Sequence, residues 1–70
     1  MYQLTDWQIT MLSRANDALL FLKRNPDEEE CYDWLIDHDV RITGSEQYRT
    51  KIIIWAGLHV NRVLGKVIKD

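Results

Sequence analysis

The sequence predicts an all-α fold, a small three-helix domain with helices at about 5–24, 26–38 and 44–69. Two observations carry this prediction. In each segment apolar residues recur at spacings of three, four and seven, which is the periodicity of an amphipathic helix. Each segment also begins with a polar sequence of the kind that caps a helix N-terminus. Because 46% of the 70 residues are hydrophobic and 29% are charged, we expect one folded domain that covers residues 1–70.

The first helix is predicted to begin at a capping box. The hydroxyl of Thr5 can accept a hydrogen bond from the backbone of Gln8, whose side chain can reach back to the backbone of Thr5. One side of the helix that follows is apolar. It consists of Trp7, Met11, Leu12, Ala15, Ala18, Leu19 and Leu22. We expect these residues to face the core.

The second helix is predicted to start within Asn25 to Glu28, with Pro26 at the first helical position, where its missing N–H costs nothing. Its apolar side consists of Cys31, Trp34, Leu35 and His38. Another side carries the carboxylates of Glu30, Asp33 and Asp37. This short helix is therefore expected to separate an apolar face from an acidic one.

The third helix is predicted to start with a capping sequence from Thr43 to Glu46. Its main apolar stripe consists of Ile52, Ile53, Ala56, Val60, Val63, Leu64 and Val67. Ile54 and Leu58 fall on the far side, so the middle of the helix is apolar nearly all round, as in a helix that is buried on more than one side. A chain of this length buries only about 60% of its surface by itself. We therefore expect self-association, as a homodimer, through Ile54 and Leu58.

One alternative fold is a winged-helix-like α+β arrangement with a hairpin at 40–55. Residues 40–43 alternate in polarity as a strand does, and residues 50–55 are rich in β-branched side chains. A turn at Gly44 would join the two strands.

The charges are unevenly placed along the chain. Residues 1–40 hold three basic and nine acidic residues, a net charge of −6, whereas residues 41–70 hold six basic and two acidic residues, a net charge of +4. Seven carboxylates lie within 27–39 without a basic residue among them. A helix dipole favours carboxylates at the start of a helix and disfavours them toward its end. It therefore leaves Asp33, Asp37 and Asp39 without a local explanation.

This acidic segment is the predicted functional surface. Its partner-binding residues would be Asp27, Glu29, Glu30, Asp33 and Asp37. We expect them to bind a protein partner with a basic surface, and the charges could imitate those of a nucleic acid. The alternative is that the carboxylates are simply solvated, or that they face the basic third helix.

The sequence supports a catalytic or metal-binding function less well than it supports an acidic partner-binding surface. Glu30, Asp33 and Asp37 share one helical side, but acid–base catalysis needs a pocket that splits their pKa values, and a short helix in a small domain offers little wall. No catalytic or phosphate-binding motif is present. Cys31, His38 and His59 are too few and too far apart for a zinc site. We expect a protein without enzymatic activity, cofactor or metal.

A DNA-binding regulator of the helix-turn-helix or winged-helix type is the alternative function. Its nucleic-acid-binding residues would be Lys51, Arg62, Lys66 and Lys69 on the third helix. Tyr48 and Trp55 are interleaved with them and could stack on bases. The net charge of −2 and the pI of about 5.6 count against this interpretation.

The remaining features bear on location. No secretory signal is evident, and no uninterrupted apolar run exceeds the five residues of 52–56, which is far too short to cross a membrane. The single cysteine, Cys31, fits a reducing compartment. We expect a cytoplasmic protein without a membrane partner.

No known family motif is matched, although in size and charge the chain is similar to small effectors of phages and mobile elements. We expect a regulator, an inhibitor or an accessory subunit.

Overall fold

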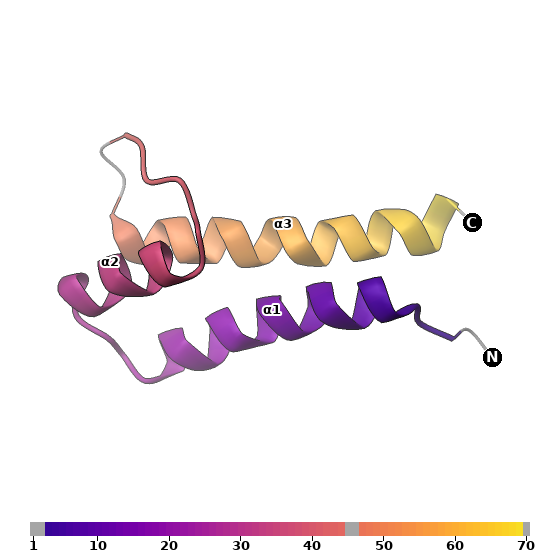
Figure 1. Ribbon diagram of the computed structural model, residues 1–70, viewed down its shortest axis with the longest axis horizontal. Coiled ribbons are helices and arrows are strands. Elements are labelled where there is room, and N and C mark those ends of the chain that lie inside the picture. The colour runs from indigo at the N-terminus through magenta and orange to yellow at the C-terminus, as the bar shows by residue number, and fades with distance from the viewer. Residues whose placement is uncertain (1–2, 45–46, 70) are drawn as a thin grey trace.

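Three helices make up the fold in the computed structural model, which describes residues 3–44 and 47–69, with the backbone alone for residues 66–69. They are α1 (Asp6–Lys23), α2 (Glu28–Asp37) and α3 (Tyr48–Lys69). Helices α1 and α3 run antiparallel along the length of the molecule, and the short α2 packs at one end (Figure 1). The predicted all-α three-helix fold is confirmed.

The winged-helix alternative is wrong. The described parts of the chain contain no strand, and residues 50–55 lie inside α3 while residues 40–43 form an irregular connection. The β-branched run is accommodated in a helix because one of its isoleucines, Ile52, is completely buried there. Such packing outweighs the small difference in helix propensity among these residues.

The capping box at the start of α1 is confirmed. Thr5 Oγ1 accepts a hydrogen bond from the Gln8 N–H at 3.2 Å, and Gln8 Oε1 accepts one from the Thr5 N–H at 2.8 Å. At the other end of α1, Asn25 has a left-handed conformation (φ 57°), and its N–H donates to the Leu22 carbonyl at 3.0 Å. Asn25 therefore ends α1 and does not begin α2, which corrects the predicted start of the second helix.

Helix α2 begins and ends with acidic residues in structural roles. Asp27 is the N-cap, and its carboxylate accepts from the Glu30 N–H at 2.9 Å. Asp39 follows the helix with a φ of 56°. Its N–H donates to the Ile36 carbonyl at 3.1 Å, and the Val40 N–H donates to the Leu35 carbonyl at 2.9 Å. This pair of hydrogen bonds is a Schellman motif.

The left-handed conformation of Asp39 leads to a testable ranking of variants. Because glycine has no Cβ to clash in this conformation, we expect Asp39→Gly to raise the free energy of unfolding by about 0.5–1 kcal/mol. Asp39→Ala should lower it by about 1 kcal/mol. Urea unfolding followed by circular dichroism measures both. In the control variant Asp17→Gly, which alters an exposed position inside α1, glycine should destabilise instead. Equal losses at both positions would contradict the prediction.

The third capping sequence does not begin a helix. Helix α3 starts at Tyr48 and not at residue 44, and Ser45 and Glu46 of the predicted box lie outside the described residues. Gly44, just before them, has a φ of 85°, a conformation that glycine adopts without strain.

The core lies where all three helices meet. It consists of Ala15, Ala18, Leu22, Cys31, Leu35, Ile52 and Ala56. Beyond α2 the molecule is only two helices wide, and its extents are 42 × 24 × 16 Å. Its radius of gyration of 13.4 Å exceeds the value of about 11 Å for a compact chain of this length.

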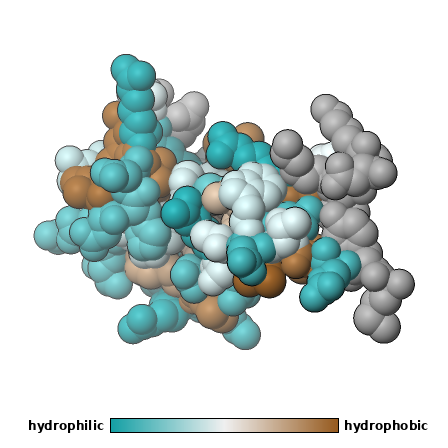
Figure 2. Space-filling model, turned by 45° about the vertical axis from the view of Figure 1, so that its right-hand side comes forward, coloured by the Kyte–Doolittle hydropathy of each residue, from teal (hydrophilic) through white to brown (hydrophobic). Residues whose placement is uncertain are grey.

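Four residues that were expected in the core are exposed, which corrects the sequence prediction: Trp7, Leu19, Ile53 and Leu64. Two helices side by side bury only the sides that face each other. Hydrophobic side chains therefore reach the surface between hydrophilic ones (Figure 2). The side chain of Val67, predicted to lie on the same stripe, is outside the described residues. No described helix is both long enough and apolar enough to cross a membrane.

Candidate functional site

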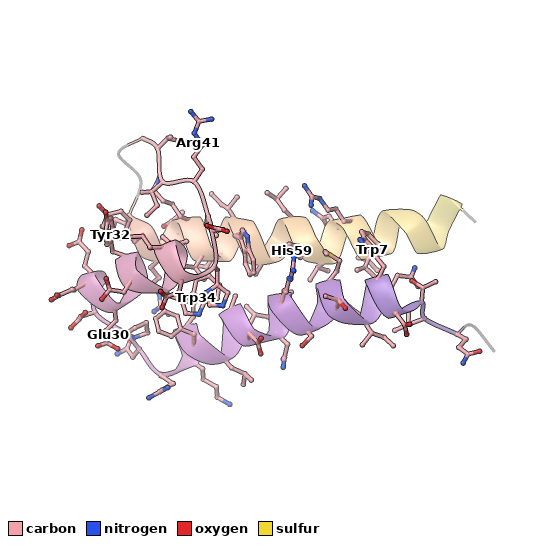
Figure 3. The ribbon with its side chains drawn as sticks, viewed as in Figure 1. Trp7, Glu30, Tyr32, Trp34, Arg41 and His59 are labelled. Atoms are coloured by element: carbon pink, nitrogen blue, oxygen red, sulfur yellow. The ribbon has the colours of Figure 1, made fainter. Side chains whose placement is uncertain are left out.

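The predicted acidic surface is exposed on α2. All five of its carboxylates are accessible: Asp27, Glu29, Glu30, Asp33 and Asp37. Figure 3 labels Glu30 among them. At about 100° per residue, the last four of these fall within an arc of about 100°. That arc lies opposite Cys31 and Leu35, which are buried against the rest of the protein. The structure therefore brings these carboxylates together on the outer side of one helix, and this set of five is called the acidic surface below.

Local structure explains some of these carboxylates and leaves two unexplained. Asp27 is the N-cap of α2, and Glu29 and Glu30 lie in its first turn, where the dipole favours negative charge. Asp39, which the sequence left unexplained, occupies the left-handed position that asparagine and aspartate tolerate best after glycine. Asp33 and Asp37 have no such local role.

The acidic surface is not neutralised from within the described residues. All five carboxylates are exposed, and no arginine or histidine side chain among the described residues, nor that of Lys23, forms a salt bridge with them. Helix α2 turns its apolar side to α3 and its carboxylates to solvent, as the solvated alternative expects, and Arg49 of α3 lines the same cleft as Asp27.

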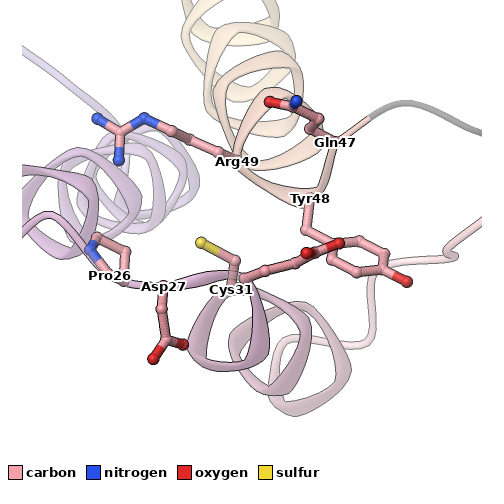
Figure 4. A pocket seen from close by; sticks show the side chains of 7 residues that line it. Pro26, Asp27, Cys31, Gln47, Tyr48 and Arg49 are labelled. Carbon is pink, nitrogen blue, oxygen red and sulfur yellow. The ribbon is translucent and has the colours of Figure 1, made fainter.

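The candidate catalytic residues do not share a cleft in the described structure. Glu30 and Asp33 line none of the three clefts described here, whereas Asp37 lines one of them together with Arg14 and His38. At the start of α2 there is a cleft of ≈ 290 Å³ (Figure 4). It is lined by Pro26, Asp27, Glu28, Cys31, Gln47, Tyr48 and Arg49. Burial raises the pKa of the Cys31 thiol, and the nearby carboxylates of α2 raise it further while Arg49 opposes them. The thiol is therefore protonated and a poor nucleophile at neutral pH.

The candidate metal ligands are not brought together. Cys31 is buried near the start of α2, whereas His38 is exposed at its end, about 10 Å further along the axis at 1.5 Å per residue. His59 lies on α3. Among the described residues, no group of three or more histidine, cysteine, aspartate or glutamate side chains could hold a metal ion.

The two candidate nucleic-acid-binding residues whose side chains the structure describes, Lys51 and Arg62, differ in exposure. Lys51 is buried, and its Nζ donates a hydrogen bond to the carbonyl of Thr43. Arg62 is exposed, and the side chains of Lys66 and Lys69 lie outside the described residues. Moreover, the connection from α2 to α3 spans residues 38–47, which is longer than the three or four residues of a helix-turn-helix. The tertiary contact of Lys51 could not be read from the sequence.

The predicted self-association residues Ile54 and Leu58 are both about half exposed. They line one side of a groove of ≈ 320 Å³ between α3 and the α2–α3 connection, together with Val40, Arg41, Thr43, Lys51 and Trp55. The connection leaves them uncovered.

An aromatic cluster at the end of α2 was not predicted. Trp34 stacks on His38 with ring centroids 3.7 Å apart, stacks on Phe21 at 5.7 Å and meets the edge of Trp55 at 5.2 Å. His38 Nδ1 lies 2.8 Å from the carbonyl of Trp34, to which it can donate. Beside the cluster is a cleft of ≈ 410 Å³ lined by Arg14, Asp37, His38, Asp39 and Trp55. The four-residue spacing of Trp34 and His38 was the available signal.

The burial of His59 is the other feature that the sequence did not predict. This side chain is buried between α1 and α3 (Figure 3), with Nδ1 3.2 Å from Met11 Sδ and its ring 4.1 Å from that of Trp55. Its Nε2 is buried without a hydrogen-bond partner among the described residues. Burial lowers the pKa of His59, and the positive charges of Arg14 and Arg62 lower it further. The imidazole is therefore neutral in the folded protein at neutral pH.

The geometry thus describes a short α-helical chain with an acidic surface exposed on α2. The chain matches no known family model, no curated protein and no solved structure.

Proposed function

We propose that this protein is a non-enzymatic regulator, an inhibitor or accessory subunit that binds a basic surface of a protein partner through the acidic surface of α2. The observation that carries the proposal is the exposure of Asp33 and Asp37 without a neutralising partner among the described residues. Asp37 is the last residue of α2, where a negative charge costs a few tenths of a kcal/mol, and Asp33 lies in the middle of the helix without a local role. Binding of a basic partner to these two carboxylates would account for their presence, because charge complementarity accelerates and orients docking.

The charge density supports imitation of a nucleic acid. Six exposed carboxylates lie between Asp27 and Asp37, a span of about 15 Å at 1.5 Å per residue. That is one charge for about 2.5 Å of axis. Duplex DNA carries one charge per 1.7 Å or so, and each strand alone about one per 3.4 Å. We therefore propose that the partner site is one that also accepts a phosphate backbone.

Apolar side chains beside the acidic surface support protein binding in particular. Tyr32 and Ile36 are exposed on α2, next to Glu29 around the helix at about 100° per residue. Interfaces between proteins combine an apolar centre, often with tyrosine, and a polar rim. Tyr32 is held in place by an edge contact with Tyr48, with ring centroids 5.2 Å apart. The acidic surface thus has a positioned apolar edge.

The experiment is capture of partners from nuclease-treated lysate with the tagged protein. We expect Asp33→Lys with Asp37→Lys to weaken binding of the captured protein at least tenfold, or about 1.4 kcal/mol, and to reduce its salt dependence. The matched control is Asp6→Lys with Asp17→Lys, which makes the same change of net charge at exposed positions of α1. It should retain most of the binding. Duplex DNA should compete for the captured protein.

Two outcomes would count against the proposal. Equal losses in both double variants would mean that net charge alone matters, and that α2 holds no special surface. Loss of all binding on nuclease treatment, together with loss in Arg62→Glu, would favour the DNA-binding alternative through α3.

A further inference from the structure

The folded chain exposes more surface than a monomer of its size should. Its accessible surface is 5558 Å² for a mass of 8.3 kDa. Folded monomers of this mass expose about 4,600 Å² by the usual scaling with size. The excess is therefore about 1,000 Å², slightly more than the roughly 800 Å² that each partner buries in a standard protein–protein interface.

A continuous uncharged face on α3 accounts for part of this surface. Between residues 50 and 65, the side of α3 that points away from α1 and α2 carries four half-exposed aliphatic residues: Ile53, Ile54, Leu58 and Leu64. The other residues of this side are Thr50, Gly57, Asn61 and Gly65. No charged residue of α3 lies on it, although Lys51 and Arg41 line the groove at its edge, beside Ile54 and Leu58. These eight residues are called the outer face of α3 below.

Gly57 lies at the centre of the outer face. A glycine inside a helix costs stability relative to alanine, so a structural reason for it would be expected. Among the described residues there is none, because a Cβ at Gly57 would have no heavy atom of another part of the structure within 4 Å, and the same holds at Gly65. The neighbours of Gly57 on the helix surface, three or four residues away, are Ile53, Ile54, Val60 and Asn61. The result is a shallow notch between aliphatic side chains, which allows another helix backbone to approach closely.

We propose that two copies of this chain form a symmetric dimer through the outer face, with α3 crossing α3 of the second copy at Gly57. A second copy is the occupant that the charges favour. Each copy carries a net charge of −2, so identical copies must meet where no charge opposes its own image. The outer face meets this condition, whereas the acidic surface would repel itself. The dimer goes beyond the proposed partner binding and leaves the acidic surface exposed, because α2 packs against the opposite side of α3.

The test is the dissociation constant of the dimer, measured by sedimentation equilibrium from low to several hundred micromolar. Wild type should dimerise in this range. Gly57→Ala should raise the melting temperature of the dilute monomer by about 4–8 °C, the shift that removal of a helical glycine predicts for a domain of this size. Gly57→Leu should raise the dissociation constant at least tenfold, although the monomer has room for the side chain. Ile54→Lys should also raise it at least tenfold, because each interface would bury two lysines.

The control is Leu20→Lys, which places the same charge at an equally exposed leucine on α1. It should dimerise as wild type does. A monomeric wild type throughout the concentration range overturns the proposal, and so does a dimer that tolerates both Gly57→Leu and Ile54→Lys, which would have to use another face. Loss of dimerisation in Gly57→Leu and Ile54→Lys with retention in Leu20→Lys supports it. Binding of a basic partner is a separate measurement, so either proposal can fail alone.

Discussion

Replacing Leu35 with alanine is expected to lower the free energy of unfolding by about 3–4 kcal/mol. Leu35 is completely buried where α2 meets α3, and its carbonyl closes the Schellman motif at the end of α2. A domain of this size is stabilised by only about 4–10 kcal/mol in total. The variant should therefore lose about a third or more of its stability, as measured by urea denaturation followed by near-ultraviolet circular dichroism of the tryptophans.

The matched control is Leu20→Ala, the same chemical change at an exposed position of α1. It should cost less than about 1 kcal/mol, because little apolar area is lost from the interior. Similar losses in the two variants would mean that α2 is not anchored through Leu35.

Acidification from pH 7 to pH 5 is expected to destabilise the protein through His59. The unfolded chain binds a proton at this histidine below about pH 6.5. In the folded protein, burial between α1 and α3 and the neighbouring Arg14 and Arg62 hold the pKa of His59 lower. In that window the folded state binds fewer protons than the unfolded state. The free energy of unfolding must therefore fall as the pH drops through this window, and level off below the pKa of the folded state.

Substitution at His59 tests this assignment. Between pH 7 and pH 5, the free energy of unfolding should fall less in His59→Leu than in the wild type, because the contribution of this histidine is removed. At pH 7 the variant should be more stable by about 1 kcal/mol or more, because the buried Nε2 lacks a hydrogen-bond partner in the structure. His38→Gln, at an exposed histidine, should keep the acid-dependent loss. If the loss of stability between pH 7 and pH 5 persisted in His59→Leu and disappeared in His38→Gln, the role of His59 would be refuted.

Helix type and number were predictable from the sequence because apolar periodicity reports directly on burial. Helix starts were harder to predict, because capping residues serve more than one local structure. Asn25 stands before Pro26 as an N-cap would, yet it ends α1 in a left-handed conformation, and Asp27 caps α2 instead. Asparagine suits both positions, so local sequence alone does not separate them.

In the candidate site, too, local features were predictable and contacts between separate segments were not. The acidic surface was predictable, since it depends on spacing within one helix. The commitment of Lys51 to the Thr43 carbonyl and the contact of His59 with Met11 were not, because each depends on how separate segments pack. Periodicity also overestimated the core: Trp7 and Leu64 follow the apolar stripes but lie where only two helices meet.

The contact between His59 and Met11 spans 48 positions of sequence, whereas that between Arg49 and the Leu22 carbonyl, nearer α2, spans 27. Loop-closure entropy rises only with the logarithm of length, so the longer closure costs about 0.5 kcal/mol more. We therefore expect α1 and α3 to pair first at the α2 end, beside the core cluster, and afterwards at Met11 and His59. In the native ensemble the contacts at Met11 and His59 should open before those beside the core cluster. Backbone amides near the start of α1 then exchange with solvent through partial openings, while those around Leu22 and Ile52 exchange only when the whole domain unfolds.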